Sequence, residues 1–126
     1  MPTPQTVFDS IPREDHFELF HGSKPDYEKV IRFLEFRKED VSKATNVPES
    51  SVRYDHKMPR ELQDRILEWA IAIHLVSEHF GDFDRAMLWF RVPNPLLGGI
   101  SPRDMIRIGR FKKLLRFIHT ALGENR

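Results

Sequence analysis

The chain has 126 residues, of which 40% are hydrophobic and 31% are charged, and its formal net charge at pH 7 is +1. This length suits a single globular domain with its own core. The absence of cysteine excludes disulfides, cysteine catalysis and cysteine–zinc sites. The sequence has no apolar run of about 18 residues and no signal peptide at its start, so we expect a cytoplasmic protein that does not span a membrane.

Residues 1–24 carry several helix breakers. Pro2, Pro4, Pro12 and Gly22 interrupt a stretch that has no sustained apolar period, and this pattern predicts an N-terminal arm. Apolar residues are nevertheless present at positions 7, 8 and 11 and from 17 to 20. We therefore expect the arm to dock on the body of the protein or on a second copy of it.

Three short helices are predicted after the arm. Apolar residues recurring every three or four positions predict a helix over 25–36, with Pro25 at its first position. A second helix is predicted over 38–45 and a third over 48–54, with Asn46 supplying the turn between them.

The last two of these helices, with their turn, have the shape of a helix-turn-helix, in which the first helix braces a second that enters the major groove of DNA. Flanking cations would hold phosphates. A small three-helix packing unit without DNA contact explains the same pattern. The residues expected to face DNA are Lys43, Ser50, Ser51, Arg53, Tyr54, His56 and Lys57, with Lys38 near the phosphates.

The longest periodic segment spans residues 60–80. Its apolar residues at positions 62, 66, 69, 73, 76 and 80 follow a four–three spacing that forms one narrow seam along a helix. We expect this helix to be the centre of the core, although the seam also suits a dimer surface. Gly81 is predicted to end the helix, and Asp82 to cap the next one over 83–90.

A connector rich in proline and glycine follows, and its pattern predicts a sharp turn. Ser101 is predicted to cap a helix over 102–108, with Pro102 at its first position, and a last helix is predicted over 110–122. Every predicted element is helical, so the predicted fold class is all-α. The landmark residues of the connector are Trp89, Asn94, Pro95, Gly98, Gly99, Ser101 and Pro102.

Positive charge is concentrated at the C-terminal end. From Ser101 to Arg126, basic residues outnumber acidic ones seven to two, so this quarter is basic while the rest of the chain is mildly acidic. From charge alone, a solvated helix face and a partner-binding element are both consistent with this distribution.

The sequence offers little for catalysis or metal binding. His74 and His79 lie on one predicted helix but are five positions apart, an offset that turns them away from each other. The chain has no glycine-rich phosphate loop with Lys-Ser or Lys-Thr, and Gly98–Gly99 lacks the third glycine of a dinucleotide fingerprint. We therefore expect no metal ion, no cofactor and no enzymatic activity.

The segment 86–106, together with Gly109 and the closing helix, resembles the toxin-binding domain of the Xre/MbcA/ParS antitoxins. The resemblance rests on the tryptophan, Asn-Pro, Gly-Gly and Ser-Pro landmarks of the connector. The segments 50–55 and 58–59 also resemble the Xre-type region that precedes that domain. The likeness covers roughly residues 25–123 and leaves the arm outside.

This resemblance implies the antitoxin of a type II toxin–antitoxin system, whose partner is a RES-domain toxin that consumes NAD. Such an antitoxin covers the active-site cleft of the toxin and often represses its own operon, so the NAD chemistry belongs to the partner. The implied organisation is an arm over 1–24, an Xre-like helix-turn-helix region over 25–59 and a helical toxin-binding domain over 60–126, in a homodimer that binds operator DNA. The residues expected to meet the toxin are Arg110, Lys113, Arg116, Phe117, Thr120, Asn125 and Arg126.

Two other functions remain open from the sequence. A stand-alone DNA-binding regulator would use Ser50, Ser51, Arg53 and Tyr54 without a toxin partner. The third alternative is a small helical enzyme, for which the sequence offers no set of catalytic residues.

Overall fold

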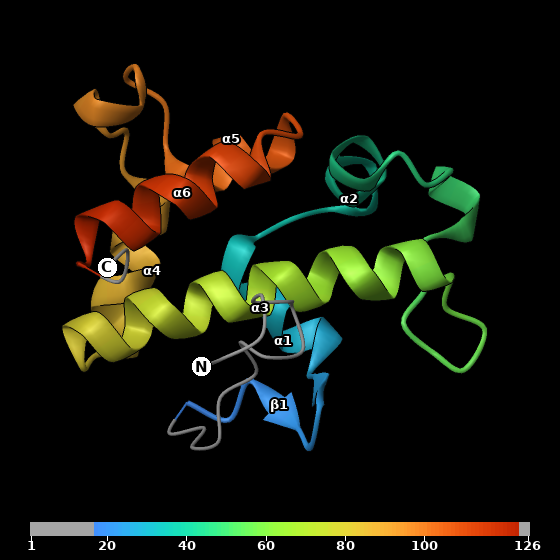
Figure 1. The fold of residues 1–126 in the computed structure, drawn as a ribbon. Coiled ribbons are helices and arrows are strands. Elements are labelled where there is room, and N and C mark those ends of the chain that lie inside the picture. Colours follow the sequence, from blue (N-terminus) through green and yellow to red (C-terminus); the bar gives the residue numbers. More distant parts are fainter. Residues whose placement is uncertain (1–16, 124–126) are drawn as a thin grey trace, which may run out of the picture.

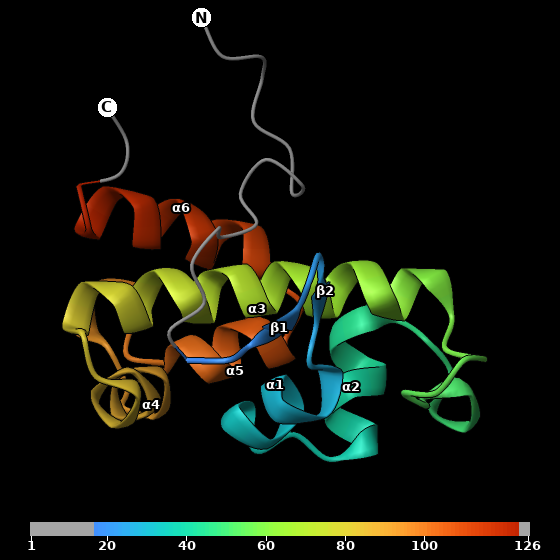
Figure 2. The same cartoon turned by 90° about the horizontal axis from the view of Figure 1, so that it is seen from below.

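The computed structural model describes residues 17–123. Its longest helix, α3 (Arg60–Phe80), forms the axis of the molecule, and the other elements pack along it (Figure 1). Helix α6 (Phe111–Ala121) and α1 (Tyr27–Leu34) lie on opposite sides of α3, and a short hairpin crosses over α3 in the same view (Figure 2). The predicted all-α class is confirmed. No helix in the described part of the chain is both long and apolar enough to cross a membrane.

The hairpin is the one extended element that the sequence did not predict. Strands β1 (Phe20–His21) and β2 (Lys24–Pro25) pair antiparallel, because Gly22 adopts a φ of 66° that closes the turn between them. Leu19 and Phe20 are buried in the core. The predicted docking on the body is therefore confirmed for this part of the arm, while positions 7, 8 and 11 lie outside the described residues.

Helix α1 begins two residues later than predicted. Pro25 belongs to β2, and Asp26 caps α1 by accepting a hydrogen bond from the backbone N–H of Lys29 at 3.2 Å. Helix α2 spans Lys38–Thr45, as predicted, and ends at Asn46, which adopts the left-handed φ of 63° that suits asparagine.

The prediction of a third helix over 48–54 is wrong. Only a 3₁₀ turn, η2 (Glu49–Ser51), forms there, and Val52 leaves it in an extended conformation with its side chain buried. The chain then turns at Asp55, whose carboxylate accepts hydrogen bonds from the Lys57 backbone N–H and the Arg53 guanidinium. Serines and a β-branched valine favour such local turns over a helix, so the described chain has no second α-helix of a helix-turn-helix here.

Helix α3 has the predicted bounds and contributes more residues to the core than any other described element. Five residues of its seam are at most 1% exposed: Leu62, Ile66, Trp69, Ile73 and Val76. The flanking residues from Ala70 to His74 are buried as well, because α1, α2, α4 (Phe83–Arg91) and α6 all pack against this helix. The seam is therefore occupied within the chain.

The connector between α4 and α5 (Pro102–Arg107) forms the predicted sharp turn. Asn94 organises it: its side-chain Oδ1 accepts the backbone N–H of Leu96 at 2.9 Å, and its backbone pairs with Ile100 around the 3₁₀ turn η3 (Pro95–Leu97). Gly98 and Gly99 have φ values of 79° and 84°, which an L side chain rarely adopts. Ser101 caps α5 as predicted, by accepting the backbone N–H of Asp104 at 3.1 Å.

Ion pairs of Glu35 and Asp40 join the N-terminal helices to the C-terminal ones, and Asp40 pairs with Arg107 at 3.9 Å. Glu35 ends α1 in the left-handed backbone conformation. Its carboxylate pairs with Arg91 at 3.3 Å and with Arg103 at 2.9 Å. Helix α2 also packs on α5. The two predicted regions thus lie against each other, and the boundary after residue 59 stays a prediction.

Candidate functional site

The exposed face of α6 is the most basic surface of the C-terminal quarter. Arg103 pairs with Glu35, and Arg107 pairs with Asp104 at 2.9 Å. Within residues 17–123, no ion pair is formed by the cations of α6 and its cap, which are all exposed: Arg110, Lys112, Lys113 and Arg116. Three of them lie at the N-terminus of α6, where the helix dipole disfavours positive charge, so intramolecular stability does not explain their presence.

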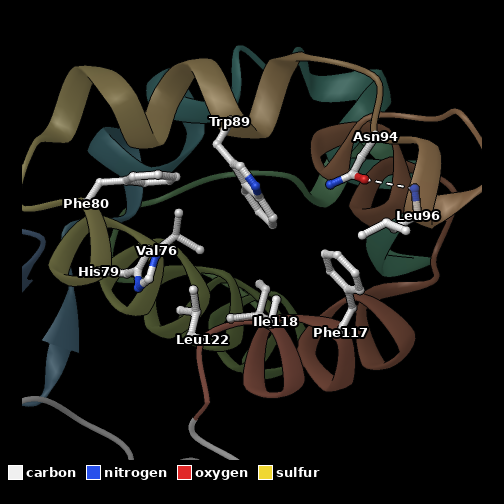
Figure 3. Close-up of a pocket in the computed structure, with 10 residues that line it drawn as sticks. Val76, His79, Phe80, Trp89, Asn94, Leu96, Phe117, Ile118 and Leu122 are labelled. Atoms are coloured by element: carbon white, nitrogen blue, oxygen red, sulfur yellow. Dashed lines mark hydrogen bonds between the residues drawn. The ribbon is translucent and has the colours of Figure 1, made fainter.

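The opposite end of α6 borders an apolar groove with a volume of about 230 Å³. Phe117 of α6 and Leu122, which caps that helix, line one wall, Trp89 of α4 and Leu96 of the connector line another, and Phe80 closes one end (Figure 3). We call this the aromatic groove; its remaining lining residues are Val76, His79, Asn94, Ile118 and Ala121. The rings of Trp89 and Phe117 stack with their centroids 6.4 Å apart.

A second hollow, of about 300 Å³, lies at the N-terminal end of α6. Residues from the end of α2, the middle of α3 and the start of α6 line it, among them Arg65, Arg110, Lys112 and Lys113. Glu68 is the one acid in its lining, and it pairs with Arg65 at 3.0 Å. Burial raises the pKa of Glu68, while Arg65 and Lys112 oppose that shift. Positive charge therefore remains in excess around this hollow.

The residues predicted to contact a toxin share one helix and its cap. Arg110, Lys113, Arg116 and Thr120 are exposed, and the half-buried Phe117 lines the aromatic groove. The predicted Asn125 and Arg126 lie outside the described residues. Sequence reasoning did not identify Phe80, Leu96 and Leu122 as part of this surface. Phe80 and Leu122 have the spacing of ordinary core residues, Leu96 lies in the connector, and only the fold shows that all three border one hollow.

The two tryptophans of the chain differ in burial. Trp89 is half-buried, and it contacts the last helix through Phe117. The fully enclosed tryptophan is Trp69, which is 1% exposed.

The residues predicted to face DNA come from α2, η2 and the following loop. Lys43, Ser50, His56 and Lys57 are exposed, while Ser51 and Tyr54 are half-buried. Arg53 is exposed, but its guanidinium is bound in a two-pronged contact with Asp55, with Nε 2.7 Å from the carboxylate. That contact and the Lys57 N–H lower the pKa of Asp55 to about 2. These residues share one end of the molecule, but apart from Lys43 on α2 they lie on a 3₁₀ turn and a loop rather than on a recognition helix.

The described residues offer no metal-binding cluster. Between positions 17 and 123, no three histidine, aspartate or glutamate side chains lie close enough to hold a metal ion. Burial is the main cause of the two raised tyrosine pKa values, at Tyr27 and Tyr54, and neither residue lies in the aromatic groove.

Comparison with known proteins finds a similar fold among solved structures. No family model matches the sequence, and no curated protein matches it. Among solved structures, the chain is similar to a chain of the M. tuberculosis MbcT–MbcA toxin–antitoxin complex, with 23% sequence identity and a TM-score of 0.51 over 79% of this chain and 93% of that chain. The two chains share a fold. The shared region amounts to most of this chain and nearly all of the other.

Proposed function

We propose that this chain is the antitoxin of a type II toxin–antitoxin system, a non-enzymatic protein that binds and neutralises a RES-domain toxin. The observation that carries the proposal is the fold shared with a chain of a toxin–antitoxin complex. The resemblance of residues 86–106 to the toxin-binding domain of the Xre/MbcA/ParS antitoxins supports the same function and supplies the RES-domain partner.

The surface that we assign to the toxin is the exposed face of α6. Its cations have no acidic partner within residues 17–123, and arginines are well suited to polar contacts in a protein interface. On this proposal the NAD chemistry takes place on the toxin, and residues 60–126 form the part of the antitoxin that covers its cleft.

Co-expression tests the proposal directly. A RES-domain toxin encoded beside this gene should stop growth when expressed alone, and growth should return when this chain is co-expressed. The two proteins should also co-purify. Arg116→Ala should keep the thermal unfolding midpoint of the wild-type chain while weakening the complex; Arg32→Ala, an exposed residue of α1, is the matched control. A toxin that stays lethal and does not co-purify with the wild-type chain would contradict the proposal.

The proposal extends to repression of the operon by a homodimer that contacts operator DNA through residues 25–59. The exposed side chains of Lys43, Ser50 and Lys57 at one end of the molecule support it. Two copies would present two such ends, which shares the cost of association between half-sites. A gel shift on the promoter of its own operon, weakened by added salt and by Lys43→Ala with Lys57→Ala, is the expected result. No shift at low salt would remove this part of the proposal and leave toxin binding untouched.

A further inference from the structure

The aromatic groove presents apolar side chains to solvent. Leu96, at its rim, is 79% exposed. Trp89 and Phe117, which form facing walls, are only half-buried (Figure 3). Where large apolar side chains line one hollow, binding of an apolar group is favourable, because it removes their surfaces from water. A volume of about 230 Å³ suits the insertion of a single large apolar side chain.

The polar atoms of the groove include two unused hydrogen-bond donors. Because Oδ1 of Asn94 accepts the backbone N–H of Leu96, its Nδ2 group is the end that remains available, with two N–H donors. Trp89 carries a further donor at Nε1. Within residues 17–123, neither group donates to another residue, and neither can accept, so their complement is an oxygen acceptor.

The cations of α6 near the groove also call for a partner that carries oxygen atoms, in their case carboxylates. Lys113 precedes Phe117 by one helical turn, so the two residues are neighbours on α6. Arg116 is turned about 100° around the helix from Phe117, so it meets the part of a bound segment that continues out of the groove over the exposed face of α6. Both cations are exposed, and neither pairs with an acid in the described part of the chain. An acidic group near an apolar anchor would meet these cations at short range.

We propose that the aromatic groove binds an acidic segment of a protein partner, with one apolar side chain of that segment inserted into the hollow beside the stacked rings of Trp89 and Phe117, against Leu96. Carboxylate or carbonyl oxygens of the segment accept hydrogen bonds from Asn94 and Trp89, and carboxylates pair with Lys113 and Arg116. This assignment rests on the proposed function in one respect, which is that the RES-domain toxin is the protein that carries the segment. A second copy of this chain, and residues 1–16 of the same chain, are the two competing occupants.

Calorimetric titration of the full-length chain with the purified toxin tests the apolar contact. Leu96→Asp changes an exposed loop residue, so the fold is retained. The new carboxylate repels the acidic segment that we assign to the groove, and we expect at least about a 30-fold loss of affinity. Phe117→Ala should cause a loss of similar size. Leu88→Ala removes a side chain that is 63% exposed on α4 and does not line the groove, and it should stay within about threefold of wild type.

Charge reversal tests the acidic character of the segment. The double variant Lys113→Glu with Arg116→Glu should lower affinity by about 100-fold, and wild-type affinity should fall as salt is raised. The control is Lys24→Glu with Arg32→Glu, which makes the same change in net charge at two exposed positions on β2 and α1 and should stay within about threefold of wild type.

The outcomes separate this proposal from the proposed function. If the wild-type chain binds the toxin and the Leu96, Phe117 and charge variants bind equally well, the groove assignment is wrong while the antitoxin function stands. If Leu96→Asp converts a dimer into a monomer in sedimentation analysis without changing toxin affinity, a second copy occupies the groove. If removal of residues 1–16 raises affinity more than about tenfold, that segment occupies it. Either of the last two results overturns the assignment.

Discussion

The indole ring of Trp89 and the phenyl ring of Phe117 lie nearly parallel, with 12° between their planes and 6.4 Å between their centroids. One ring comes from α4 and the other from α6, so this contact joins the two helices that carry the aromatic groove. Both rings remain half-buried, which means that they contribute to the fold and face solvent at the same time.

The two tryptophans should differ in their contribution to stability. Trp69 is 1% exposed, so Trp69→Ala should lower the free energy of unfolding by about 3–5 kcal/mol. Trp89 is half-buried, so Trp89→Ala should cost less, roughly 2 kcal/mol, in proportion to the smaller area removed from water. Urea unfolding at pH 7 measures both values. A larger loss for Trp89 than for Trp69 would contradict the burial described for the two rings.

Gly98 tests the geometry of the connector. Its φ of 79° is unfavourable for an L side chain, while a Cβ at this position would meet no atom within 4 Å. Gly98→Ala should therefore destabilise the protein by backbone strain alone, by about 1 kcal/mol. Gly98→Asn should cost less, because asparagine tolerates left-handed backbone. Equal unfolding midpoints for the alanine variant and the wild type would show that the loop does not hold this conformation.

Glu35 should couple α1 to both α4 and α5. Its carboxylate is half-exposed and pairs with Arg91 and Arg103, and exposed pairs of this kind contribute about 0.2–1 kcal/mol each. Glu35→Gln should therefore lower stability by no more than about 1–2 kcal/mol. In a double-mutant cycle, Arg103→Ala should have a smaller effect in the Glu35→Gln background than in the wild type. Strictly additive losses would mean that the two side chains do not interact in solution.

Asp55 should titrate well below an ordinary aspartate. Its pKa is lowered from 3.8 to about 2, first by the Arg53 hydrogen bond and then by the Lys57 backbone N–H. Because the folded-state pKa is depressed, the stabilisation from this group is present above about pH 4 and is lost as the pH falls toward 2. Carboxyl chemical shifts followed by NMR should show the midpoint rising in Arg53→Ala but remaining below that of an unperturbed aspartate, because the Lys57 contact persists. An unchanged midpoint in Arg53→Ala would assign the shift to another cause.

The helices could be predicted where local signals agree with the packing. In α3 and α2, apolar spacing, a proline or carboxylate at the start and a left-handed residue at the end all specify the same bounds, so the sequence predicts them correctly. Ser101 and Pro102 predict the start of α5 for the same reason, since capping depends on neighbouring residues alone.

The errors occurred where side chains outside the segment decide the structure. Pro25 is an acceptable first residue of a helix, but pairing with Phe20 places it in a strand. Residues 48–54 have a helix-like spacing, yet Val52 is buried in an extended conformation and Asp55 holds a local turn. The aromatic groove could not be predicted either, because periodicity assigns Phe80 and Leu122 to a core without showing which of their sides is left open.

Helix α3 begins beside the loop that contains Lys57 and ends in the wall of the aromatic groove, at Phe80. With 21 residues, it spans about 30 Å. The aromatic groove and the loop that contains Lys57 therefore lie at opposite ends of a rigid helix. Arg110 and Lys113, which we assign to the toxin, line the second hollow together with residues 44–46, next to Lys43, which we assign to operator DNA. On these assignments, a toxin that covers the N-terminal end of α6 competes with DNA at Lys43, whereas a toxin segment held in the aromatic groove leaves the Lys57 loop free.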